Sequence, residues 1–469
     1  MSSDAPVFSL QYELVDAEEH LKNGNESPWN RWWVLCVYSI FAALQGMVWI
    51  IPGTFQDNFL NVYGMDGNAV QLVTNYGCFL FVVAAWPSMW ALDRWGTRTP
   101  VLLGVGAMLV CNVLRMCARD SSLGSVALVH VSCILDALAG PVSMAAASKL
   151  AEDWFPPMER TTATAIAALS NPCGTIFVYA LLPLLCPEPD AASMQRMNAC
   201  ILCLTAVNCA MALRYFPAFP RVAPSASSEH SRATGGAQLT SAQLLSSWGR
   251  LLRNRTYVAI VVTYGLWAGL FSPAGALLTS NLGQLDASLS LVGWVGAAAN
   301  GASAILGVLS ARLSDRLKAR FPGSMKALLL ASAAGGAVCF LFFQLAMPAS
   351  GSLGLTPSAA LAAACAAFIA ANAFLGAFTC LAFDFAAEHS FGEPEASMLM
   401  GVLIPMNMVS GISLCVPSSD FLSWINWGVA AAAFLSLALL AALVPADSPK
   451  LQFDLEAAQT EAYLGVGSG

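Results

Sequence analysis

Twelve long apolar runs constrain this chain more strongly than any other feature of its 469 residues. A helix needs about 20 apolar residues to cross a bilayer core of roughly 30 Å, and each run has about that length. Backbone groups inside a bilayer must bond within their own segment, and the alternating pattern of barrel strands is missing, so the sequence predicts an all-α membrane protein. The runs lie near residues 31–53, 68–91, 98–117, 124–150, 160–186, 194–216, 254–281, 288–313, 325–347, 357–387, 395–417 and 421–444.

Composition and charge agree with this interpretation. The chain is 57% hydrophobic and only 10% charged, which is more apolar than a soluble domain tolerates. If both ends lie in the cytosol, all 21 Lys and Arg residues fall on the cytosolic side except Arg115, Arg119 and Arg196. The net charge is −7, and the sequence contains no basic face that would suit nucleic acid. We therefore expect an integral, multi-pass protein that contacts membrane lipid, has both termini cytoplasmic and binds no nucleic acid.

A charged turn of one Asp and two Arg occurs twice, after the second run of each half of the chain. Internal repeats of this kind are typical of secondary transporters. The first turn contains Asp93, Arg94 and Arg98, and the second, 222 residues later, contains Asp315, Arg316 and Arg320.

A second repeat, E-x-x-F-x-x-x-E, begins at Glu152 and recurs 236 residues later at Glu388. The two repeats together divide the chain into similar halves of six runs, joined by a stretch rich in Pro, Ser and Gly. The predicted parts are a cytoplasmic tail (1–30), a first half (31–216), a cytoplasmic linker (217–253), a second half (254–444) and a second tail (445–469).

The repeated charges are candidates for an inner gate, because opposite charges attract more strongly where a closing interface excludes water. Glu159 and Glu395, the last residues of the two E-x-x-F-x-x-x-E copies, are candidate partners. The alternative is a set of solvated charges that only fix the topology. The predicted gate comprises Asp93, Arg94, Arg98, Glu159, Asp315, Arg316, Arg320, Asp384, Glu388 and Glu395.

Asp136 lies well inside an apolar run, where an ionised acid costs about 2.5–3.5 kcal/mol on an insertion scale. It is therefore a candidate functional residue. Either it binds and releases a proton that drives symport, or it stays ionised as the counter-ion of a cationic substrate; a structural hydrogen bond is the third alternative. Arg115 and Arg119, in contrast, are expected near the outer surface, where long side chains reach water.

Other polar and aromatic side chains within the runs predict a substrate cavity. Gln45 and Trp49 are four residues apart and share one helix face, although packing alone would also explain them. Gly and Pro in the seventh run either break that helix or permit close packing. A small solute with a cationic or aromatic portion is expected to stack on Trp49, with Tyr264 or Trp267 opposite. The predicted substrate-binding residues are Gln45, Trp49, Asp136, Tyr264, Trp267 and Asn372.

Several other function classes are disfavoured. The sequence contains no Walker motif and no nucleotide-binding domain, which argues against a pump. Its four histidines, His20, His130, His230 and His389, lie in loops or at the ends of runs, so we expect neither a hydrolytic enzyme nor a metal or other cofactor. A receptor that transports nothing stays open as an alternative. The expected protein is a monomeric secondary carrier of a small-molecule substrate.

Short motifs narrow this further: Trp154-Phe155 up to Glu159 with Thr162-Ala163-Thr164 after it, Ala382 to Glu388 up to Glu395, and Thr263 to Leu266. Together with the runs of residues 31–444, they resemble major facilitator superfamily carriers and, among these, the feline leukaemia virus subgroup C receptor-related family, solute carrier family 49. The segments most similar to its disrupted in renal carcinoma protein 2 branch are 45–49, 138–141, 162–167 and 422–427.

The resemblance implies twelve transmembrane helices in two six-helix halves. It also implies transport of choline or ethanolamine, of haem or, for that branch, of pyridoxine, across an endolysosomal or plasma membrane. Trp49 corresponds to the family's substrate-stacking Trp. Ser272, Pro172 and Met408 stand where the family's choline site is completed by a Tyr and two Gln, which argues against choline. No His or Cys constellation suits a haem iron.

Overall fold

Twelve helices that are long and apolar enough to cross a membrane make up most of the described chain, and no strand occurs within it. The prediction of an all-α membrane protein is thus confirmed. The computed structural model describes residues 28–180, 185–186, 188–225, 228–229, 241–276, 278–318, 321, 323–348, 354–414, 421–445, 449–453 and 456. The twelve helices are α2 (Pro28–Thr54), α4 (Gly67–Trp95), α5 (Arg98–Cys117), α6 (Leu123–Trp154), α7 (Pro157–Ala180), α9 (Ala191–Arg214), α12 (Arg255–Ala276), α14 (Leu289–Lys318), α15 (Ser324–Ala346), α16 (Pro357–His389), α17 (Glu395–Leu414) and α18 (Phe421–Leu443).

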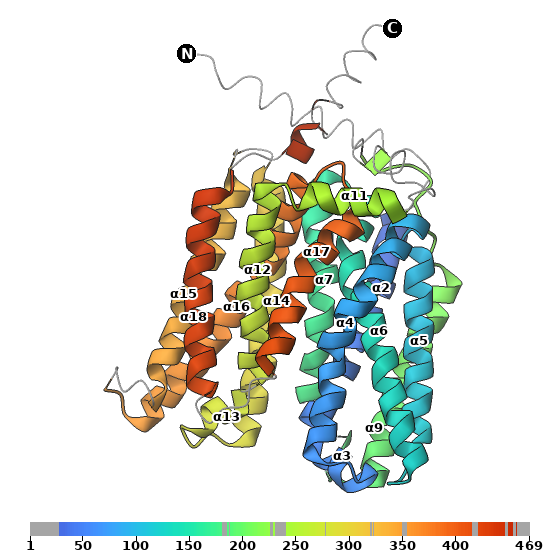
Figure 1. Cartoon of the computed structure of the whole chain (residues 1–469), viewed down its shortest axis with the longest axis vertical. Coiled ribbons are helices and arrows are strands. Elements are labelled where there is room, and N and C mark those ends of the chain that lie inside the picture. The colour runs from blue at the N-terminus through green and yellow to red at the C-terminus, as the bar shows by residue number, and fades with distance from the viewer. Residues whose placement is uncertain are drawn as a thin grey trace, which may run out of the picture.

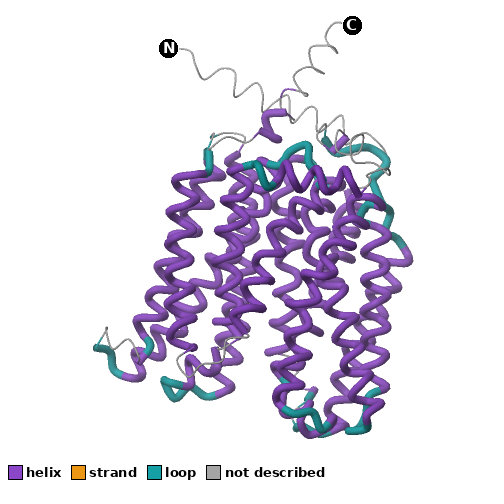
Figure 2. Tube along the Cα trace, in the orientation of Figure 1, coloured by secondary structure: helices purple, strands orange, loops and turns teal. Residues whose placement is uncertain are grey.

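The helices form two six-helix halves, drawn in blue to green and in yellow to red in Figure 1. Helices α2 to α9 make up the N-terminal half, and α12 to α18 make up the C-terminal half. At the seam between the halves, α7 packs against α14, and α4 packs against α17. Figure 2 shows the two halves converging toward one end of the bundle and diverging toward the other.

Two ion pairs lie at the end of the bundle where α2 begins and where the chain continues after α18. Arg31, near the start of α2, lies 2.9 Å from Glu159 near the start of α7. Lys450, after α18, lies 2.9 Å from Glu152 near the end of α6. We name this the basic end, because the sequence gathers its Lys and Arg residues there. Helices α3 (Gln56–Tyr63) and α13 (Leu278–Gly283) lie at the opposite end (Figure 1).

The expected linker, 217–253, contains a helix that its composition does not indicate, α11 (Ser241–Leu251). It lies across the basic end in Figure 1. The Trp248 indole donates a hydrogen bond to Met89 Sδ of α4 at 2.9 Å. Two residues later in α11, Arg250 Nη2 donates to Glu393 Oε2, before α17, at 2.8 Å. Helix α11 therefore contacts both halves.

Helices α2 and α7 approach closely because glycines line their contact. A Cβ atom on Gly174 would lie 1.9 Å from the carbonyl oxygen of Ala43, and one on Gly46 would lie 2.2 Å from that of Asn171. Both obstacles are backbone atoms, which cannot turn aside as a side chain can. The α2–α7 contact therefore depends on glycine at these two positions.

Helix α12 is continuous from Arg255 to Ala276 and includes Pro273. The break that the sequence allowed near the middle of this run does not occur. A Cβ atom on Gly265 would lie 2.8 Å from Pro405 Cβ, and one on Gly269 would lie 2.8 Å from Val409 Cβ. These glycines therefore serve the close packing of α12 on α17.

We expect Gly174→Ala to lower the melting temperature of the purified protein, because overpacking of a fixed contact costs about 1–3 kcal/mol. Gly106→Ala in α5 is the matched control, since a Cβ atom there would meet nothing within 4 Å. Its melting temperature should equal or slightly exceed that of the wild type, because Ala favours helix over Gly. Thermal unfolding in detergent, followed by tryptophan fluorescence, measures both. Equal melting temperatures for the two variants would contradict the packing argument.

Candidate functional site

Asp93, at the end of α4, bonds to the start of a helix in the other half. Its carboxylate accepts hydrogen bonds from the backbone N–H groups of Ala396 and Ser397, both at 3.1 Å, and from Ser397 Oγ at 2.6 Å. These residues form the first turn of α17, where N–H groups lack partners within the helix and the helix dipole favours negative charge. One buried aspartate thus joins α4 to α17 across the seam.

Asp315, its repeat counterpart in α14, makes the reciprocal contact with the N-terminal half. Its carboxylate accepts from the backbone N–H groups of Thr161 at 3.3 Å and Thr162 at 2.8 Å, and from Thr162 Oγ1 at 2.8 Å. Both threonines lie near the start of α7. The two charged turns of the sequence therefore occupy equivalent places on either side of the seam.

A buried lysine adds positive charge to the second contact. Lys318 Nζ lies 2.9 Å from Asp315 Oδ1 and 3.9 Å from Asp384 Oδ2, and it donates a hydrogen bond to Thr161 Oγ1 at 3.1 Å. The Thr161 hydroxyl in turn donates to Asp384 Oδ2. Asp384 belongs to α16 and Thr161 to α7, so this cluster also crosses the seam.

The glutamate partners expected for the charged turns are described only in part. Glu159 forms an ion pair with Arg31 inside the N-terminal half. Arg94 lies over the Trp90 ring, with its guanidinium carbon 5.2 Å from the ring centroid. The aspartates bond to helix starts, and the pairing of Glu159 with a charged turn stays a prediction.

Of the remaining predicted gate residues, two are exposed, one is buried, and two lie wholly or partly outside the described residues. Arg98 and Arg316 are exposed at the basic end. Arg320 and the side chain of Glu395 lie outside the described residues, although Glu395 begins α17. Glu388 is buried, and its Oε2 accepts the backbone N–H of Leu451 at 3.1 Å.

Gln45 is the centre of a hydrogen-bond network inside the N-terminal half. Its Oε1 accepts from Asn171 Nδ2 at 2.6 Å and from Ser143 Oγ at 3.1 Å, and its Nε2 donates to the backbone carbonyl of Asp136 at 3.4 Å. These partners belong to α7 and α6. One amide side chain therefore links α2, α6 and α7 at the depth of the bilayer.

Asp136 is only 2% exposed, and its Oδ1 has no hydrogen-bond partner among the described residues. Arg115 of α5 is 4% exposed and bonds to α6 about one helical turn before Asp136. The guanidinium donates to Ser132 Oγ at 3.2 Å, to Cys133 Sγ at 3.4 Å and to the carbonyl of Val48 at 3.3 Å. The expectation that Arg115 reaches water at the surface is therefore wrong. Its charge acts on the Asp136 carboxylate without forming a direct ion pair.

The predicted aromatic residues lie in separate halves and do not face each other across a shared space. Trp49 Nε1 donates to the carbonyl of Thr74 at 3.2 Å, and its ring packs on Gly77 of α4. Trp267 is 0% exposed and packs against Phe378, with ring centroids 4.7 Å apart.

Tyr264 is also buried in the C-terminal half, with its ring centroid 5.2 Å from that of Phe383. Asn372 is half-buried, and its side chain makes no hydrogen bond to another described residue. Of the six predicted substrate-binding residues, the structure brings only Gln45 and Asp136 into direct contact.

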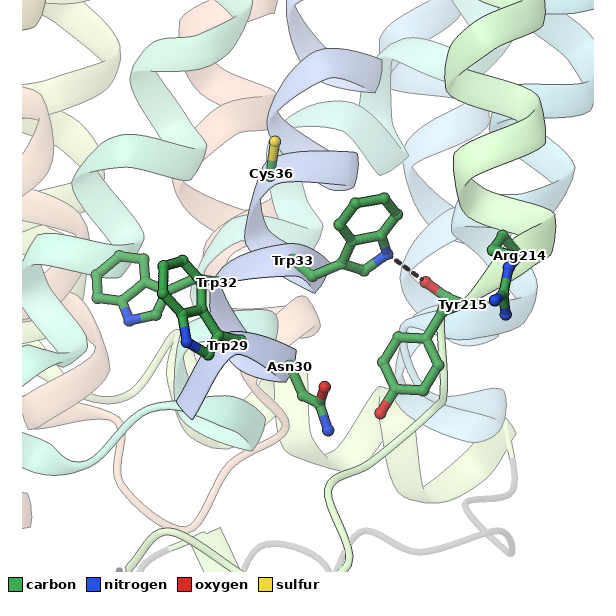
Figure 3. Close-up of a pocket in the computed structure, with 7 residues that line it drawn as sticks. All are labelled: Trp29, Asn30, Trp32, Trp33, Cys36, Arg214 and Tyr215. Atoms are coloured by element: carbon green, nitrogen blue, oxygen red, sulfur yellow. Dashed lines mark hydrogen bonds between the residues drawn. The ribbon is translucent and has the colours of Figure 1, made fainter. Parts of the chain in front are cut away.

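A groove of about 570 Å³ lies apart from this polar centre, where α2 begins and α9 ends (Figure 3). The Trp33 side chain lies across the groove, and its Nε1 donates a hydrogen bond to the carbonyl of Tyr215 at 2.9 Å. The groove lies at the basic end of the N-terminal half, whereas Gln45 and Asp136 lie deeper in the bundle. Its lining residues are Trp29, Asn30, Trp32, Trp33, Cys36, Arg214 and Tyr215.

Comparison with known proteins gives consistent matches. The family model of the Major Facilitator Superfamily matches residues 34–413. Solute carrier family 49 member 4 homolog of Xenopus tropicalis is 28% identical over 434 residues, which cover 88% of this chain and 90% of the relative. Choline/ethanolamine transporter FLVCR2 of Rattus norvegicus is 25% identical over 287 residues, which cover 58% of this chain and 52% of the relative.

Among solved structures, the proton:xylose symporter XylE bound to 6-bromo-6-deoxy-D-glucose superposes with a TM-score of 0.67. It is 13% identical in sequence, and the match covers 92% of this chain and 99% of that one. At this identity the similarity concerns the fold alone. The predicted twelve-helix fold and the resemblance to solute carrier family 49 are both confirmed by these matches.

We expect Asp93→Asn to raise amide hydrogen exchange about tenfold or more at the start of α17, because hydrogen bonds to charged groups are each worth about 1.5–3 kcal/mol. If Asp93 holds the seam closed, exchange should also rise at Thr161 and Thr162, which Asp93 does not touch. Asp190→Asn is the matched control, since Asp190 caps its own helix α9 by accepting from Ser193 N–H at 2.8 Å. A rise confined to α17 would reduce Asp93 to a local helix cap.

Proposed function

Since this chain belongs to the Major Facilitator Superfamily, and its curated relatives are members of solute carrier family 49, we propose that it is a secondary transporter moving a small organic solute by alternating access. The observation that supports this most directly is the reciprocal pair of aspartate contacts at the seam. Each contact joins one half to a helix start of the other, so rocking of the halves would break both together.

These contacts suit a gate because they are replaceable by water. A carboxylate and a helix start are both well hydrated when the seam opens, so the open state leaves neither group without partners. We propose that the basic end faces the cytosol, following the distribution of Lys and Arg. The described conformation is then closed toward the cytosol, and transport requires Asp93 and Asp315 to release their helices.

We place the substrate site beside the Gln45 network. A carboxylate oxygen without a hydrogen-bond partner at bilayer depth is energetically costly, so such acids are functional candidates. Asp136 Oδ1 is such an atom. Trp49 lies one helical turn from Gln45, so its aromatic ring would border the proposed site. Asn372 supplies a free amide from the other half. The substrate class that fits these groups is a small hydroxylated aromatic solute of the pyridoxine type or a small organic cation.

Tyr264 and Trp267 take a different part in this proposal from the one their sequence positions suggest. Their rings are enclosed by Phe378 and Phe383 inside the C-terminal half. They therefore support the wall of the site by fixing α12 against α16, and they do not stack on the substrate in this conformation.

Arg115 argues against a counter-ion role for Asp136, and the role we propose for Asp136 is therefore proton binding. The guanidinium already supplies positive charge next to the carboxylate, which lessens its need for a cationic substrate. Protonation of Asp136 would leave Arg115 without a negative neighbour and thus alter the packing of α5, α6 and α2. The second candidate is a choline or ethanolamine carrier, which the similarity to the choline/ethanolamine transporter FLVCR2 favours.

Purified protein in proteoliposomes should take up pyridoxine in preference to choline, ethanolamine and haem. Gln45→Leu should reduce that uptake by about tenfold or more, because a buried Asn171 amide and Ser143 hydroxyl lose their shared acceptor. Thr54→Val, which removes a hydroxyl that donates to the Ile50 carbonyl and is not part of the Gln45 network, is the control and should retain uptake. Uptake of choline alone would establish the second candidate, and the absence of any solute flux would leave only a non-transporting receptor.

Asp136→Asn should abolish the dependence of uptake on an inward proton gradient while leaving residual substrate exchange. Asparagine keeps the shape of the side chain but cannot bind and release a proton. Uptake and exchange measured at acidic and neutral pH separate the alternatives. Loss of substrate binding at both pH values would identify a counter-ion, whereas wild-type affinity, flux and pH dependence would return Asp136 to a structural role.

A further inference from the structure

Residues 449–453, which follow α18, touch both halves at the basic end, and Lys450 and Leu451 among them are buried. Lys450 is 1% exposed, and its Nζ lies 2.9 Å from Glu152 Oε1 of α6. The next residue, Leu451, donates its backbone N–H to Glu388 Oε2 of α16 at 3.1 Å. A segment of five residues thus bonds to one helix of the N-terminal half and one of the C-terminal half.

The two glutamates hold equivalent places in the internal repeat. Glu152 and Glu388 are the first residues of the two E-x-x-F-x-x-x-E copies, and they lie in the last turns of α6 and α16. The segment therefore lies where the two halves meet and contacts the same element of each. A third contact comes from Phe453, whose ring centroid is 5.0 Å from that of Phe391 in the loop after α16.

The charges around Lys450 explain why its position depends on both halves. Its positive charge acts on Glu152 and Glu388 together. Arg160 and Lys149 also act on Glu152, and Lys318 also acts on Glu388. Burial of an ammonium group is costly and is offset only where carboxylates surround it in good geometry. If α6 and α16 separated, Lys450 would lose this arrangement and would be more stable in water.

We propose that residues 449–453 are a C-terminal latch that holds the basic end closed and must be released before α6 and α16 can separate. The proposal rests on alternating access as the proposed function, and it assigns to this segment a control of the transport cycle that is distinct from the aspartate contacts. Because the buried charge pair gains little net free energy, the latch is reversible. Any process that removes the segment from the seam would favour the open state.

Hydrogen exchange on the full chain in lipid nanodiscs, without any solute, tests the latch. Lys450→Met keeps the apolar stem of the side chain and removes its charge. We expect exchange to rise about tenfold or more at the ends of α6 and α16, because loss of one partner of a buried charge pair strongly accelerates its opening. Exchange should rise as well at Thr161, Thr162 and Ser397, which the latch does not touch.

Gln452→Met is the matched control, because Gln452 lies in the same segment with an exposed side chain. It should leave exchange unchanged. Should Lys450→Met fail to fold, Phe453→Ala removes a contact without leaving a buried charge alone and is expected to act in the same direction. A rise restricted to residues 449–453, or none beyond that of Gln452→Met, would overturn the latch. Since no solute is present, this result does not depend on whether the transport assay succeeds.

Discussion

Carboxylates bound to helix starts across the seam are the interaction on which the closed basic end depends. The first N–H groups of a helix have no partner inside it, so α17 and α7 each need an acceptor from elsewhere. Asp93 and Asp315 provide it only while the halves are together. The surrounding helices are apolar and can slide in lipid, so these few polar bonds determine how the halves are aligned.

The sequence predicts the architecture well because the bilayer leaves few alternatives. The run at 98–117 coincides with α5, and the other runs begin within three residues of their helices and end within six of them. The internal repeat also identifies both aspartates that bond across the seam. Their partners cannot be predicted because they are backbone N–H groups, which every residue except proline carries. The glutamates of E-x-x-F-x-x-x-E are the partners that the sequence pattern favours instead.

The polar centre is predictable only in part. Gln45 and Asp136 stand out as polar residues inside apolar runs, and they do meet. Arg115 was missed because an arginine near the end of a run normally reaches water, and the only signal against this is a single acid in the next run. The direction in which Trp267 points depends on the rotation of α12, which Gly265 and Gly269 fix by packing on α17.

Helix α7 gives the N-terminal half a mechanical connection between its centre and its edge. It carries Asn171, which bonds to Gln45, and Thr161, which bonds to Asp315, ten residues or about 15 Å apart along one rigid rod. The glycine contacts with α2 leave this rod little freedom to slide. A small tilt caused by a ligand at Gln45 would therefore appear, as at the far arm of a lever, as a displacement at the seam.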